Sequence, residues 1–187
     1  MKRKLGIVIV AVLMLSCVAV QASASAHEFV FSKAGEHRDK NLKEVEWVFA
    51  AGDLSCEKES SHGTASSGKL EAFEEIETFE ACIFLGEDAE LSKPKVRFRA
   101  TGEVSIESLL EVKVPGLGCD IKIEPAHNST LKTVNYKNLE GGKLEVKSSV
   151  TGITYTSSGG ACGSSGTTGE YKGASELELV GGTIEWK

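Results

Sequence analysis

Hydrophobic and polar side chains alternate along most of the chain. Between residues 93 and 100 every odd position is basic, and the even positions are Pro94, Val96, Phe98 and Ala100. A period of two is typical of a strand with one buried face. The same alternation predicts further strands near residues 45–49, 104–106, 110–114, 119–123, 134–136, 144–146, 153–155, 177–179 and 184–186.

Glycine-containing turn signals separate these segments at short intervals. They fall at residues 101–102, 115–118, 140–142, 158–160 and 180–182. Many short strands with such spacing indicate a single-domain, all-β, antiparallel β-sandwich or barrel-like fold over residues 27–187. The polar segment 33–43 and the Gly/Ser/Thr-rich segment 162–169 are expected to be loops.

The segment 69–84 is ambiguous. Leu70, Phe73, Ile76 and Phe79 have helical spacing, but the stretch through Cys82 also suits a strand. We favour the strand, because Cys82 and the apolar residues after it resemble a buried edge more than a helix end.

The first 26 residues have the three parts of a secretory signal peptide. A basic start (Lys2 to Lys4) precedes an apolar run and the small residues up to Ala26, so cleavage would leave a chain that starts at His27. The apolar run is short for a membrane span, which needs about 20 residues. In an alternative interpretation, Cys17 is a bacterial lipoprotein site and carries a lipid anchor.

Charge argues against two classes of partner. The chain has 21 basic and 27 acidic residues, and loss of the three basic residues in the signal peptide leaves a net charge of −9. Such a surface repels phosphate backbones and anionic lipid headgroups, so we expect neither a nucleic-acid partner nor binding to a membrane surface. We also expect no transmembrane span after cleavage, because the apolar run is short.

Four cysteines remain after the predicted cleavage: Cys56, Cys82, Cys119 and Cys162. An even number in an exported protein predicts disulfides, and the spacing matches neither a zinc site nor a C-x-x-C redox motif. Four cysteines allow three connectivities. We favour Cys56–Cys82 and Cys119–Cys162, because each pair then links neighbouring segments.

An acidic run offers candidate chemistry. Eight acids and no base lie between Glu71 and Glu90, and two of them, near Glu74 and Glu87, could serve a glycosidase. The basic residues of segment 93–99 offer cross-strand partners, so we expect solvated ion pairing instead. Residues 86–90 lack the spacing of a calcium loop.

Other signals for chemistry are weak. The four histidines are dispersed, nucleophile and phosphate-loop motifs are missing, and no cofactor is implied. His27 at a new N-terminus could chelate copper, a geometry that also arises by accident. Asn128 begins an N-glycosylation sequon. Trp47 and Trp186 have the apolar parity of their strands, so we expect core packing and not sugar stacking.

Several stretches taken in order resemble a family of small exported proteins, without an assigned function, that occur in many copies in soil actinobacteria. They are Val48–Gly52 leading to Ser55–Cys56, Phe79–Cys82, Gly118–Ile121, Leu131–Asn138, and Ile153–Thr156 running on to Gly159–Cys162 and Gly169–Gly173. The resemblance implies no catalytic residue, ligand or partner. Members often carry two further cysteines, in the region matching 95–106, which fits the loss of one whole bridge and the pairing favoured above.

The sequence therefore predicts an exported, non-catalytic all-β protein that binds an envelope or extracellular component. The alternatives are a secreted carbohydrate hydrolase that uses the acidic residues and a lipid-anchored envelope protein attached through Cys17.

Overall fold

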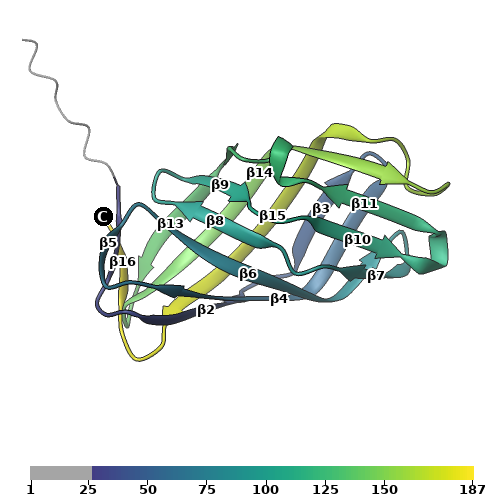
Figure 1. Ribbon diagram of the computed structural model, residues 1–187. Coiled ribbons are helices and arrows are strands. Elements are labelled where there is room, and N and C mark those ends of the chain that lie inside the picture. The colour runs from purple at the N-terminus through teal and green to yellow at the C-terminus, as the bar shows by residue number, and fades with distance from the viewer. Residues whose placement is uncertain (1–26) are drawn as a thin grey trace, which may run out of the picture.

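The computed structural model describes residues 27–187 (Figure 1). The predicted signal peptide, its cleavage site after Ala26 and the alternative anchor residue Cys17 lie outside the described residues. None of the helices in the described part has the length and apolar character that a membrane span needs.

Antiparallel strands make up nearly all of the described chain, as the alternating pattern predicts. In order, the elements are β1 (Phe29–Phe31), β2 (Gly35–Asn41), β3 (Val45–Phe49), β4 (Gly52–Ala65), β5 (Gly68–Leu70), β6 (Ala72–Phe84), β7 (Glu87–Leu91), β8 (Lys95–Arg99), β9 (Glu103–Ile106), β10 (Leu110–Val114), η1 (Pro115–Leu117), β11 (Cys119–Ile123), η2 (Pro125–His127), β12 (Leu131–Lys132), β13 (Val134–Leu139), β14 (Lys143–Ser158), β15 (Gly166–Leu179) and β16 (Ile184–Trp186).

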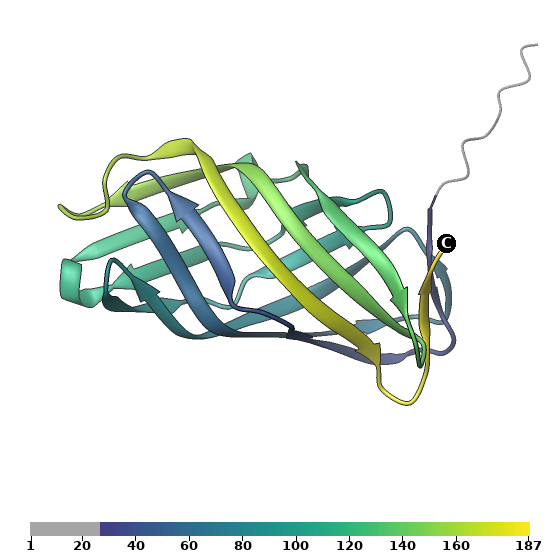
Figure 2. The same cartoon turned by 180° about the vertical axis from the view of Figure 1, so that it is seen from behind.

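The larger sheet folds over on itself into a sandwich-like body. Strand pairing runs from β4 through β6, β7, β10, β11, β14, β15 and β2, and returns to β4. The long strands β14 and β15 form one wall, and β4 and β6 lie in the opposite wall (Figures 1 and 2). Side chains of inward parity from both walls fill the interior.

A small second sheet covers one end of the body. β1 pairs with β16 on one side and β5 on the other, at the end where the C-terminus lies (Figure 1). Phe29 and Phe31 of β1 are fully buried, and Phe73 of β6 lies edge-on to both rings. This aromatic cluster closes the end of the interior.

The predicted strands and both predicted disulfides are confirmed. Cys56 is bonded to Cys82 across the β4–β6 pair, and Cys119 is bonded to Cys162, which follows β14. The ambiguous segment 69–84 is mostly strand β6, as favoured. The loop expected over residues 33–43 is wrong for most of its length, because Gly35–Asn41 forms β2 between β15 and β4.

Candidate functional site

Polar side chains cover part of the inner wall built by β2, β4 and β6. One cross-strand row consists of Asp39, Ser61 and Glu77, which are paired in register and buried. The neighbouring rows add His37 with Glu75 on one side and Glu59 on the other. We call the four acids Asp39, Glu59, Glu75 and Glu77 the inner carboxyls.

A glycine makes the contact between His37 and Glu75 possible. Gly63 lies opposite His37, and a Cβ there would come within 2.6 Å of His37 Nε2 and 2.1 Å of the Glu74 carbonyl oxygen. With no side chain in that position, the imidazole reaches across β4 towards β6. His37 Nε2 then lies 3.4 Å from Glu75 Oε1.

Burial favours the protonated form of each inner carboxyl. It raises the pKa of Glu59 to about 8, with the Asp39 carboxylate adding to the effect. It raises the pKa of Glu75 and Glu77 well above the usual range, again with neighbouring carboxylates contributing, and it raises the pKa of Asp39. A carboxyl that leaves water loses solvation of its charged form, so the neutral acid is favoured.

No positive charge compensates this group. Among residues 27–187, no lysine or arginine forms an ion pair with an inner carboxyl, and the one basic neighbour is His37. Burial lowers the pKa of His37 and raises that of Glu75, so it disfavours the charged form of both groups in this contact. Glu75 Oε1, Glu77 Oε2 and Asp39 Oδ1 have no hydrogen-bond partner.

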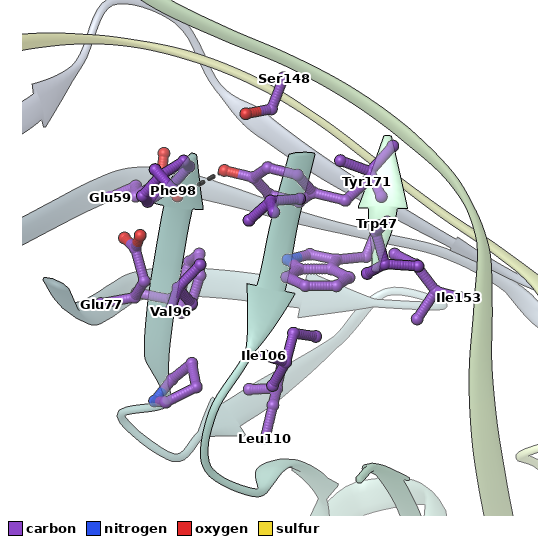
Figure 3. Close-up of a pocket in the computed structure, with 15 residues that line it drawn as sticks. Trp47, Glu59, Glu77, Val96, Phe98, Ile106, Leu110, Ser148, Ile153 and Tyr171 are labelled. Atoms are coloured by element: carbon purple, nitrogen blue, oxygen red, sulfur yellow. Dashed lines mark hydrogen bonds between the residues drawn. The ribbon is translucent and has the colours of Figure 1, made fainter. Parts of the chain in front are cut away.

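An interior cavity of about 50 Å³ lies beside Glu59 and Glu77 (Figure 3). A buried water needs roughly 10–15 Å³ by this measure, so the space suits about four atoms of that size. Aliphatic side chains of β8, β9, β10, β12 and β14 form most of its lining, together with Ser148. The cavity lining is therefore almost wholly apolar, and Glu59 and Glu77 lie at one side of it.

Aromatic rings form another part of the cavity wall. Trp47 of β3 and Tyr171 of β15 are in register, with ring centroids 4.6 Å apart, and Phe79 and Phe98 line the cavity as well. The Tyr171 hydroxyl donates a hydrogen bond to Glu59 Oε1, and burial raises the pKa of this phenol. Trp47 Nε1 faces the space between the rings and Glu77 and has no hydrogen-bond partner (Figure 3).

A change of strand partner brings the cavity close to the surface. On one side of β6, pairing with β8 ends at Ile76, and pairing with β7 begins at Cys82. The intervening residues of β6 have no strand on that side, and Phe79, Pro94 and Val96 line the cavity there. Phe79 and Val96 are only partly buried, so this seam is the short route between the cavity and solvent.

The acidic run divides between two faces of β6. Glu74 points outward and pairs with Lys95 and Arg97, as expected for solvated acids, and these cations lower its pKa. The expectation is wrong for Glu75 and Glu77, which are 2% and 5% exposed. Their odd positions share the inward parity of Phe73, and the inner face of this strand is closed by the opposite wall.

Glu74 and Glu87 do not come together. Glu87 is in register with Phe84, ten residues along β6 from Glu74. At about 3.3 Å per residue this places their backbones about 30 Å apart. The two carboxyls of a glycosidase lie about 5–10 Å apart, so this pair has no shared cleft.

Asn128 is fully buried and serves the fold. Its Nδ2 donates to the carbonyl oxygens of Glu124 and Thr154, both at 2.9 Å, and its Oδ1 accepts from the Thr154 N–H. A glycan requires an exposed amide, so the predicted sequon is not accessible in the folded protein.

The two tryptophans have different surroundings. Trp47 is 5% exposed and packs in the interior, as expected. Trp186 is partly buried, donates from Nε1 to the Ala100 carbonyl oxygen at 3.0 Å, and stacks on His27 with ring centroids 4.4 Å apart. No group of three or more His, Cys, Asp or Glu side chains in residues 27–187 is arranged to hold a metal ion.

Sequence reasoning missed His37, Asp39, Glu59 and Tyr171 as site residues. In β2 and β4 the inward-facing residues alternate with exposed ones, as in any strand with one buried face. Here, however, the inward-facing residues are mostly polar: His37, Asp39, Glu59 and Ser61, with Gly63. A search for apolar alternation passes over such strands. The one signal in the sequence was that these polar residues stand at every second position of a segment long enough for a strand.

Comparisons with protein-family models, curated proteins and solved structures find no match to this chain. The resemblance to small exported actinobacterial proteins therefore stays a prediction.

Proposed function

We propose that this chain is an exported, non-catalytic binding protein that holds one small molecule in its interior cavity. The observation that carries the proposal is a pair of buried polar groups at the cavity, Glu77 Oε2 and Trp47 Nε1, that have no partner. Buried polar atoms in folded proteins are nearly always hydrogen-bonded. A molecule with both donor and acceptor groups would satisfy these two atoms.

The protonation state of the acids supports binding rather than hydrolysis. A glycosidase needs one ionised carboxylate beside a protonated acid. Burial raises the pKa of both acids at the cavity, Glu59 and Glu77, and no lysine or arginine in the part of the chain that the structure describes pairs with either of them to favour an ionised carboxylate. A cavity of about 50 Å³ is also small for a sugar, since about 150 Å³ is needed to hold benzene.

Export is supported by the two disulfides, because such bonds persist in oxidising compartments. The intact mass of the exported product tests this part of the proposal. A chain that starts at His27 and has lost four hydrogens supports it. A diacylglycerol adduct on Cys17 would instead support the lipid-anchored alternative, and free thiols would contradict export to an oxidising compartment.

The indole N–H resonances test the binding site directly. The chain has two tryptophans, and Trp186 already donates to a backbone carbonyl oxygen outside the cavity, so its signal is an internal control. We would titrate the exported protein with ethylene glycol, acetamide, acetate and ethanolamine. We expect at least one probe to shift the Trp47 signal and leave the Trp186 signal in place.

A variant that fills the cavity provides the control. Val96→Phe adds a ring at the cavity lining, whereas Val180→Phe makes the same change at a side chain that is 45% exposed. The first variant should abolish the Trp47 shift, and the second should preserve it. If none of the four probes moves the Trp47 signal in the unmodified protein, the proposed function is wrong.

A further inference from the structure

We infer that the molecule held in the cavity is a small amino alcohol, with its ammonium group against Glu59 and Glu77 and its hydroxyl oxygen accepting from Trp47 Nε1. This inference rests on the proposed function and names the chemical class of the ligand. Size, charge and hydrogen-bonding groups each restrict the choice.

Size comes from the cavity. Its volume of about 50 Å³ accommodates about four atoms of the size of a water oxygen. A two-carbon chain with one polar atom at each end has four heavy atoms. Quaternary ammonium compounds, sugars and phosphate esters are larger.

A cationic group is indicated by the acids beside the cavity. Glu59 and Glu77 line the cavity, Asp39 lies in the row of Glu77, and Glu75 lies in the next row. No lysine or arginine pairs with these acids in the described chain. An ammonium group would donate to Glu77 Oε2, and its positive charge would favour ionisation of one of these acids. The rings of Trp47, Phe79 and Tyr171 at the same cavity add the attraction of aromatic faces for a cation.

A hydroxyl group is indicated by Trp47. Indole Nε1 can only donate, and it is buried without an acceptor. An ammonium group has no lone pair and cannot accept this hydrogen bond, so a simple alkylamine leaves it unmade. A hydroxyl oxygen on the same small molecule has a lone pair and would accept the hydrogen bond from Trp47 Nε1.

Binding of the cation must displace a proton. Burial raises the pKa of Glu59 and Glu77 and so favours their protonated forms when the cavity holds no cation, whereas an ammonium group nearby favours the ionised carboxylate. The ligand therefore enters as the ammonium ion, one carboxyl O–H bond breaks, and the proton leaves to the buffer. The charge of the interior is unchanged by this exchange.

Calorimetry with the exported protein tests the inference through that proton. Ethanolamine is titrated near pH 6.5 in two buffers that differ in ionisation enthalpy, and the difference in heat gives the protons released. We expect about one proton per bound ethanolamine. Ethylene glycol, which lacks the cation, and ethylamine, which lacks the hydroxyl, should each bind about tenfold or more weakly. O-phosphoethanolamine should not bind.

A matched pair of glutamates on β6 locates the effect. Glu77→Gln removes an acid at the cavity, and Glu74→Gln makes the same change on the outer face of the same strand. The first should weaken ethanolamine by about ten- to a hundredfold, and the second should leave it unchanged. The proton count in the unmodified protein needs no variant, so it stands even if Glu77→Gln fails to fold.

The outcomes separate the two proposals. If ethylene glycol or acetamide shifts the Trp47 resonance while ethanolamine does not, the amino alcohol is wrong and the binding cavity stands. If ethanolamine binds without proton release, or O-phosphoethanolamine binds equally well, the charge argument is wrong. If no probe binds, both proposals fall together.

Discussion

Around β10 and β11 the interior is filled with aliphatic side chains, whereas under β2, β4 and β6 it holds four carboxyls. Leu110, Val112, Ile121 and Ile123 are fully buried in the first region. In the second region, Glu75 and Glu77 are almost as well buried, yet each has a carboxyl oxygen without a partner.

This difference in polarity indicates that the aliphatic region stabilises the fold and that the acidic region costs stability. Burial of an aliphatic side chain stabilises a fold by about 1.5–3 kcal/mol, whereas a buried polar group without a partner costs stability. Uncompensated polar groups in a folded chain are concentrated at functional sites. The apolar region accordingly holds the fold together, and the acidic region is the place to look for a ligand.

The largest expected effect is the loss of stability as pH rises. Because the folded-state pKa of Glu59 is raised to about 8, this group contributes full stability below about pH 4.5 and loses it as pH rises through about 8. The slope for one such group is about 1.4 kcal/mol per pH unit. Urea unfolding should therefore give a free energy lower by about 3 to 4 kcal/mol at pH 8 than at pH 5 from Glu59 alone. A protein that is equally stable at both pH values would remove the contrast between the regions.

A substitution in the apolar region should destabilise the fold by a similar amount at every pH. We expect Ile121→Ala to lower the free energy of unfolding by about 3 kcal/mol, because the side chain is fully buried and leaves a cavity. Leu85→Ala, at a side chain that is 51% exposed, should change it by less than about 0.5 kcal/mol. An effect of Ile121→Ala that differs between pH 5 and pH 8 would mean that the two regions are coupled.

Replacing one inner carboxyl should flatten the pH dependence. Glu77→Gln removes a group whose pKa burial raises well above its usual range, so the difference in free energy of unfolding between pH 5 and pH 8 should become smaller. Comparing the two pH values within one variant cancels the pH-independent cost of the amide. An unchanged slope would show that Glu77 ionises freely in the folded protein.

The smallest effect is expected on the outer face. Glu74→Gln breaks exposed ion pairs with Lys95 and Arg97, so it should cost at most about 1 kcal/mol at low salt and less at 1 M salt. These cations lower the pKa of Glu74, so its contribution is present above about pH 4.5 and is lost as pH falls. Thermal unfolding at pH 3 and pH 6 checks this sign. A larger destabilisation by Glu74→Gln at pH 3 than at pH 6 would contradict it.

Much of the fold could be predicted from the sequence, because one buried face per strand leaves a period of two. Segment 93–100 shows this pattern and contains strand β8, and the two disulfides follow from four cysteines on neighbouring segments. β2 was missed because its inward positions are polar.

The candidate site could not be predicted for the same physical reason. Glu74 and Glu75 are adjacent in the sequence and chemically identical, but one points to solvent and the other to the interior. Their difference comes from the opposite wall, which closes the inner face, and from Gly63, which admits His37 beside Glu75. Both are long-range consequences of strand pairing.

The protonation of the inner carboxyls at neutral pH is the most direct test of the account. A carbon-13 NMR titration of the side-chain carboxyl groups measures it residue by residue. We predict that Glu59, Glu75 and Glu77 keep the chemical shift of the protonated acid at about pH 7, and that ethanolamine moves at least one of them to the ionised value. If every carboxyl in the protein has ionised by about pH 6, the interior holds no protonated acids and the account is wrong.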